Sequence, residues 1–203
     1  MASIYDLKPA FQGILRPLSN WLATHGVTAN QITISALLLS ITTGGTIALF
    51  PEQLWPLLLI APVLFIRMAL NALDGMLARE HDMKSDLGTF LNELGDVLSD
   101  TALYLPLALV PGIPSSLIIL IVLASIIVEM TGVIAVMIGS ERRYDGPMGK
   151  SDRAFVFGLI TLLMGMGMSA DIWSTSLLSV VLALSVITTI CRAHAAITTK
   201  AGE

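Results

Sequence analysis

Long apolar runs dominate the sequence and restrict the chain to a membrane fold. About six of them have close to 20 residues each, which is enough to cross a hydrocarbon core of about 30 Å as an α-helix. They lie near residues 31–50, 54–78, 87–111, 114–139, 153–169 and 172–198. The chain of 203 residues is 55% hydrophobic with a mean hydropathy of +0.82, which excludes an ordinary soluble domain. We therefore expect an all-α polytopic membrane protein with six transmembrane helices.

A segment of mixed polarity precedes the first apolar run. Apolar residues recur at helical spacing over residues 4–22, while polar residues such as Asp6 and Arg16 fill the opposite side. This pattern predicts an amphipathic helix in the membrane interface, and the alternative is a soluble helix packed on the loops. Thr28 or Asn30 is placed to cap the first span.

The basic residues indicate the orientation of the chain, because cytoplasmic loops carry an excess of Lys and Arg. They precede the first run, join the second run to the third and the fourth to the fifth, and lie near the C-terminus: Lys8, Arg16, Arg79, Lys84, Arg142, Arg143, Lys150, Arg153, Arg192 and Lys200. The opposite links, near residues 51–53, 111–114 and 168–171, contain none. We expect an inner-membrane protein without a secretory signal peptide, with both termini and the active site cytoplasmic.

The sequence contains no internal repeat, low-complexity tract or Pro/Ser-rich linker that would divide the chain. We expect a single domain over residues 1–203. Within it, residues 1–28 form the interfacial helix and its link, and residues 29–203 form the six-helix bundle.

Polar residues interrupt the second and third runs. Burying an ionisable group inside a membrane costs free energy, so each such residue is a candidate functional residue. At about 100° per residue, they form two stripes. The first holds Arg67, Asn71, Asp74, Gly75 and Ala78, and the second holds Gly88, Asn92, Asp96 and Ser99 with Glu93 and Asp100 at its edge. Two facing stripes of oxygen donors, with small residues that permit close approach, predict a site for Mg²⁺ or Mn²⁺.

A divalent ion held by carboxylates at a membrane surface suits phosphate chemistry, because it neutralises diphosphate oxygens and stabilises an oxygen leaving group. A further carboxylate can act as a base toward an alcohol. The stripes therefore favour transfer of a phosphoryl-linked group to an alcohol.

The spacing of these residues resembles the signature of the CDP-alcohol phosphotransferases. That signature is an Asp, two residues, DGxxAR, eight residues, Gly, three residues, Asp, three residues, Asp. The matching residues here are Asp74, Gly75, Ala78, Arg79, Gly88 and Asp96. Asn71 and Asn92 stand where the family has its first and third aspartates. The resemblance covers the whole chain and implies six transmembrane helices after an interfacial helix, in a homodimer.

The resemblance implies transfer of a phosphatidyl group from a CDP-linked lipid, expected to be CDP-diacylglycerol, to a free or phosphorylated alcohol, with release of CMP. The implied metal ligands are Asn71, Asp74, Asn92 and Asp96, and Glu93 and Asp100 are candidates that would restore the missing charge. Asp96 is also the candidate catalytic base. The implied nucleotide-binding residues are Asp74, Gly75, Ala78, Arg79 and Gly88. Membrane lipids are expected partners, and nucleic acid is not.

The loop GPMGKSDR resembles a segment of family members whose acceptor carries its own phosphate. It implies an acceptor pocket for an anion made by Lys150, Ser151 and Arg153 with Arg142 and Arg143. The alternative is that these basic residues only set the topology and contact anionic lipid headgroups.

Two other functions remain open. Asn71 and Asn92 favour a catalytically inactive protein of the same fold that binds the lipid nucleotide. A small cation transporter would place its carboxylates near the midplane. A transporter fits the sequence less well, because polar residues become rare after Asp100, where the chain reads TALYLPLALV.

Overall fold

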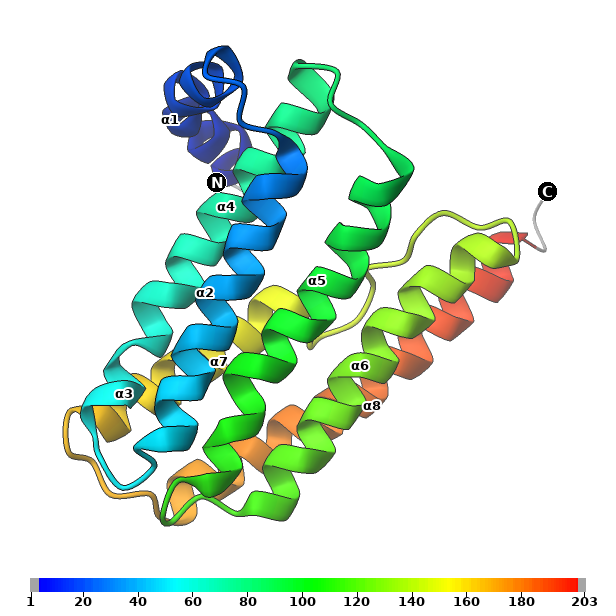
Figure 1. The fold of residues 1–203 in the computed structure, drawn as a ribbon. Coiled ribbons are helices and arrows are strands. Elements are labelled where there is room, and N and C mark those ends of the chain that lie inside the picture. The colour runs from blue at the N-terminus through cyan, green and yellow to red at the C-terminus, as the bar shows by residue number, and fades with distance from the viewer. Residues whose placement is uncertain (1–3, 201–203) are drawn as a thin grey trace. The chain divides into compact units, whose positions relative to one another are not determined.

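The computed structural model describes the backbone of residues 4–200 and the side chains of residues 11–199, and its regular structure is helical (Figure 1). The elements are α1 (Ile4–Thr24), α2 (Ala29–Leu49), α3 (Trp55–Leu58), α4 (Ile60–Glu80), α5 (Asp86–Tyr104), the 3₁₀ helix η1 (Leu105–Leu109), α6 (Ser115–Met137), α7 (Lys150–Gly165) and α8 (Ile172–Lys200). The described residues form no strand. The all-α prediction is confirmed.

Four helical segments are long and apolar enough to cross a membrane: α2, the continuous stretch Trp55–Glu80, α6 and Ile172–Thr199 of α8. The other two predicted runs correspond to α5, which carries several acidic residues, and to α7, which has 16 residues. Each of the six predicted runs overlaps a helix, and the second and third are each divided between two elements, α3 with α4 and α5 with η1. That α5 and α7 also span the membrane stays a prediction.

Two helices end or begin away from the predicted positions. The third run was expected to reach residue 111, but α5 ends at Tyr104 and the chain continues as η1, where Pro106 has no backbone N–H to continue the α-helical ladder. The fifth run was expected to begin at residue 153, but α7 begins at Lys150 because the Asp152 carboxylate accepts a hydrogen bond from the backbone N–H of Gly149 at 2.9 Å.

The chain forms two compact units, and helices α2, α4 and α5 contribute residues to both. The first unit holds the residues up to Thr42 together with Pro62–Ser99. The second unit holds Thr43–Ala61 and the residues from Asp100 onward.

In the first unit, the start of α2 and the end of α4 share an apolar core of Ala29, Ile32, Leu73 and Leu77, against which Leu15, Leu22 and Leu70 pack. The predicted cap of α2 is present. Thr28 Oγ1 accepts from the backbone N–H of Gln31 at 3.3 Å, and Gln31 Oε1 accepts from the backbone N–H of Thr28 at 3.0 Å. Arg16 of α1 forms an ion pair with Glu80 of α4 at 2.9 Å. These contacts hold α1 against the end of α4.

The helix predicted at the N-terminus is α1, and its surface supports the amphipathic pattern. Leu15 and Leu22 pack inward, while Ile14, Leu18 and Trp21 are exposed. An exposed apolar face of this kind suits a bilayer surface. That α1 lies in the interface stays a prediction.

In the second unit, α6 and α8 run side by side over much of their length (Figure 1). Its core includes the ring of Tyr104, which stacks on Phe157 of α7 with 4.1 Å between ring centroids. Ile119, Leu120, Leu123 and Ile127 of α6 are exposed. Large apolar side chains on a helix surface are expected where that surface meets lipid.

Candidate functional site

Helix α4 presents one carboxylate that is both buried and held by a neighbouring helix. Asp74 is only 7% exposed, and the hydroxyl of Thr33 on α2 donates to Asp74 Oδ2 at 2.9 Å. The methyl group of Thr33 would lie 3.5 Å from a Cβ at Gly95 of α5. A single threonine therefore fits between α4 and α5, and it fixes the Asp74 side chain.

The polar stripes of α4 and α5 meet. The amide nitrogen of Asn71 donates to Asp96 Oδ1 at 3.2 Å across the two helices. Both side chains are partly buried. The faces that the sequence predicts to converge do so at this pair.

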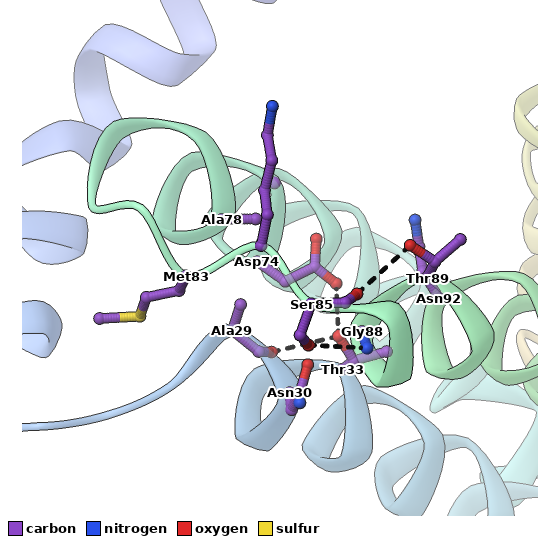
Figure 2. A pocket seen from close by; sticks show the side chains of 12 residues that line it. Ala29, Asn30, Thr33, Asp74, Ala78, Met83, Ser85, Gly88, Thr89 and Asn92 are labelled. Carbon is purple, nitrogen blue, oxygen red and sulfur yellow. Dashed lines mark hydrogen bonds between the residues drawn. The ribbon is translucent and has the colours of Figure 1, made fainter.

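A pocket of about 180 Å³ opens beside Asp74 (Figure 2). Helix α2 contributes Ala29, Asn30 and Thr33, α4 contributes Asp74, Gly75 and Ala78, the link after α4 contributes Met83, Lys84 and Ser85, and α5 contributes Gly88, Thr89 and Asn92. All of these residues belong to the first unit. The pocket therefore combines a buried carboxylate with amide, hydroxyl and ammonium groups.

The predicted residues of α4 and α5 fall into two groups, those that line this pocket and those that lie next to it. Asp74, Gly75, Ala78, Gly88 and Asn92 line it. Asn71 and Asp96 form the adjoining hydrogen bond and are not part of the lining among the described residues.

Arg79 and Glu93 are also outside the lining. The guanidinium of Arg79 folds back along its own helix, so that a Cβ at Gly75 would lie 3.0 Å from its Nη2. Glu93 is half-buried on α5.

Seven of the lining residues are not site residues predicted from the sequence, and three of these are Asn30, Thr33 and Ser85. Asn30 and Thr33 are polar positions at the start of an apolar span, where the sequence predicts only a capping role for Asn30. Ser85 caps α5, because its hydroxyl oxygen accepts from the backbone N–H of Gly88 at 3.0 Å. The sequence signal for Asn30 and Thr33 was their spacing of three residues at the start of an apolar span.

The pocket closes tightly around Gly88. A Cβ at this position would lie 2.9 Å from Asn30 Oδ1 and 3.1 Å from Ser85 Oγ. Figure 2 shows Asn30 and Ser85 beside Gly88. A side chain at position 88 would therefore require the side chains of Asn30 and Ser85 to move.

Oxygen donors of the kind that Mg²⁺ and Mn²⁺ prefer are present at this site. Two are carboxylates, Asp74 and Asp96, and two are amides, Asn71 and Asn92. Among the described residues, no three His, Cys, Asp or Glu side chains converge in a way that could hold a metal ion. The donor set fits a hard divalent cation through carboxylates and amides together.

A second polar cluster lies in the second unit, around Glu129 of α6. Arg153 of α7 donates to Glu129 Oε1 at 3.0 Å, and Arg192 of α8 donates to Oε2 at 3.4 Å. Arg142 donates to Oε2 at 3.4 Å as well. Asp100 lies 3.5 Å from Arg153. We name these five residues the arginine cluster.

The predicted acceptor residues are only partly gathered in this cluster. Arg142 and Arg153 belong to it, whereas Arg143 pairs with Asp145 at 2.9 Å in the loop before α7. Lys150 and Ser151 form the first turn of α7. Arg192 was not predicted as a site residue, and its arrival from α8 could be found only from the packing of α6 against α8.

The model of one protein family, CDP-alcohol phosphatidyltransferase, matches residues 26–192 of this chain. Inner membrane protein YnbA of Escherichia coli is 47% identical over 190 residues, which is 94% of each chain. Archaetidylinositol phosphate synthase of Pyrococcus horikoshii is 32% identical over 103 residues, covering 51% of this chain and 52% of that protein.

Solved structures of Mycobacterium tuberculosis phosphatidylinositol phosphate synthase share the fold. The structure with CDP-DAG bound has a TM-score of 0.75 at 21% identity and covers 89% of this chain and 92% of its own. The complex with manganese and citrate has a TM-score of 0.75 at 22% identity, covering 90% and 88%. The four apolar helices and the relative named an inner membrane protein indicate that this chain is an integral membrane protein.

Proposed function

Since the chain belongs to the CDP-alcohol phosphatidyltransferase family, we propose that it transfers a phosphatidyl group from CDP-diacylglycerol to an alcohol and releases CMP. The observation that carries this proposal is the meeting of the α4 and α5 stripes. The Asn71–Asp96 hydrogen bond joins the two helices beside a pocket lined by Asp74, Gly88 and Asn92. The solved relative with CDP-DAG bound supports the choice of donor.

We propose Asn71, Asp74, Asn92 and Asp96 as the ligands of Mg²⁺ or Mn²⁺, with Glu93 as a further candidate. Asp100, also a candidate from the sequence, lies 3.5 Å from Arg153 in the arginine cluster instead. When bound, the cation supplies neutralisation of the diphosphate oxygens and stabilises the departing phosphate. Thr33 fixes one carboxylate oxygen of Asp74 by its hydrogen bond. The relative solved with manganese supports a divalent cation.

The side chains of the protein carry out the proton transfer and bind the nucleotide. Asp96 accepts the proton of the acceptor hydroxyl while the hydroxyl oxygen forms a bond to the lipid-side phosphorus. The bond from that phosphorus to the bridging diphosphate oxygen breaks, and CMP leaves with the electron pair. Gly75, Ala78 and Gly88 leave room for the nucleotide, and Arg79 meets its phosphates. Asn30 and Ser85 add polar contacts at the same pocket wall.

We propose that Lys150, Ser151 and Arg153, with Arg142 and Arg143, contribute to the acceptor side. Their position in the loop and first turn of α7 supports this assignment. We further propose one family domain over residues 1–203, a homodimer, and both termini with the active site on the cytoplasmic side. The one-sided distribution of Lys and Arg supports the orientation.

One alternative has a specific observation in its favour. Two amides replace two aspartates of the family signature, so the chain could bind the lipid nucleotide without turning it over. Such a protein would retain affinity for CDP-diacylglycerol and release no CMP. The same assay therefore separates the two functions.

The test is the release of labelled CMP from CDP-diacylglycerol by the purified protein, with a mixture of alcohols as acceptors. We expect turnover with Mn²⁺ or Mg²⁺ and a loss of at least about a hundredfold after chelation, because the cation supplies several kcal/mol of transition-state stabilisation. Re-addition of the cation should restore the rate. Binding of the lipid nucleotide without CMP release under any of these conditions would establish the inactive alternative.

The pocket itself is tested by Gly88→Ala. The added methyl group would crowd Asn30 and Ser85. It should weaken CDP binding about tenfold, or about 1.4 kcal/mol. Calorimetric titration with CDP measures the effect. Gly45→Ala is the matched control, because a Cβ there meets nothing within 4 Å. Equal affinities for the two variants would show that the nucleotide binds elsewhere.

A further inference from the structure

The arginine cluster already contains the anions that its guanidinium groups require. Glu129 accepts hydrogen bonds from Arg142, Arg153 and Arg192. Its side chain is 10% exposed, and those of Arg153 and Arg192 are 0% and 2% exposed. Glu129 thus occupies the centre of three cationic side chains, where a bound phosphate would otherwise be expected.

The charges of the cluster nearly cancel. Three guanidinium groups face two carboxylates, because Asp100 also lies 3.5 Å from Arg153, and one net positive charge is left. Arg143 lies outside the cluster but is likewise paired, through two hydrogen bonds to Asp145. Each of the arginines predicted to bind an acceptor phosphate is therefore held by a carboxylate of the protein itself.

A phosphate monoester carries a charge of about −1.5 to −2 at neutral pH and three acceptor oxygens. Placed beside this cluster, it would exceed the one remaining positive charge and would repel Glu129 and Asp100. Displacing Glu129 instead would leave that carboxylate buried without its cations. Both routes disfavour a phosphorylated acceptor.

One hydrogen-bond donor in the arginine cluster could bind a group smaller than a phosphate. Within the described part of the chain, Nε of Arg153 is buried and has no hydrogen-bond acceptor. A single hydroxyl oxygen would satisfy such an N–H without bringing in charge.

We infer that the alcohol acceptor of this protein carries no phosphate group, because Glu129 already pairs with Arg142 and Arg153, and Asp145 with Arg143. This inference rests on the proposed transferase function and specifies the substrate class of that reaction. It separates this chain from an enzyme that uses a phosphorylated polyol.

The experiment compares matched acceptors in one reaction with CDP-diacylglycerol and Mn²⁺: glycerol against sn-glycerol 3-phosphate, and myo-inositol against its 1-phosphate. Mass spectrometry of the lipid products gives the ratio of kcat/KM within each pair. For the unaltered protein we expect the free alcohol to be preferred by at least about tenfold in at least one pair, because of like-charge repulsion.

Glu129→Gln removes the internal anion and keeps the shape of the side chain. It should shift the ratio toward the phosphorylated member by at least about tenfold. Inorganic phosphate should then inhibit the variant and not the unaltered protein. Glu141→Gln is the matched control, because Glu141 is exposed in the loop after α6, and it should leave the ratio unchanged.

Preference of the unaltered protein for the phosphorylated member of both pairs would overturn the inference and leave the transferase function standing. Product formation limited to free alcohols supports it, even if Glu129→Gln fails to fold. If no acceptor yields a lipid product and no CMP is released, the transferase function fails and the inference fails with it.

Discussion

Replacing Asp96 with asparagine is expected to lower the rate of CMP release from CDP-diacylglycerol by about 100- to 10,000-fold, the range for loss of a general base. The variant keeps the size of the side chain and an oxygen that can accept from Asn71, whose amide lies 3.2 Å away. It loses the negative charge and the capacity to take up a proton. The fall should appear in kcat more than in KM.

Asp86→Asn is the matched control, because Asp86 is an exposed aspartate in the first turn of the same helix. It should reduce the rate by less than about fivefold, since it removes only a favourable charge near a helix N-terminus. Circular dichroism and elution volume in detergent check that both variants fold. A similar rate for Asp96→Asn and Asp86→Asn would remove Asp96 from the reaction.

Arg153→Met is expected to lower the free energy of unfolding by about 3–5 kcal/mol, the range for breaking a buried ion pair on one side. The guanidinium is fully buried and lies 3.0 Å from Glu129 and 3.5 Å from Asp100. Methionine fills a comparable volume but leaves both carboxylates without that charge. Unfolding by denaturing detergent, followed by circular dichroism, measures the change.

Arg143→Met provides the comparison, because Arg143 pairs with Asp145 at 2.9 Å but the carboxylate is 40% exposed. An ion pair of this kind contributes about 0–1 kcal/mol. Equal losses for the two arginine variants would mean that the arginine cluster does not stabilise the fold. A larger loss for Arg153→Met, partly relieved by adding Glu129→Gln, would show that the buried carboxylate is the cause.

The sequence allowed the helices and the α4 and α5 stripes to be predicted because both depend on local spacing. Apolar runs of span length and polar residues at intervals of three and four follow directly from helix geometry. The pairing of Asn71 with Asp96 across two helices agrees with that expectation. The Thr28 cap was equally visible, because a capping box needs only four consecutive residues.

Contacts that other helices make with these stripes and with the loop before α7 could not be predicted. The contribution of α2 to the pocket depends on Thr33 reaching Asp74, 41 positions away. Likewise, Arg153 looked like a phosphate ligand in its loop sequence, and only the packing of α6, α7 and α8 brings Glu129 to it. The sequence showed that charged residues were present but not which of them neutralise one another.

The hydrogen bond from Thr33 to Asp74 has a further consequence for how the first unit assembles. A helix turns by about 100° and rises about 1.5 Å per residue, so sliding α2 by a single position would swing this hydroxyl away from the carboxylate. An apolar helix without such a polar contact could shift along its neighbour by one residue with little loss of interaction energy. Thr33 therefore fixes the axial position and the rotation of α2 relative to α4, which the apolar residues of α2 alone would not fix.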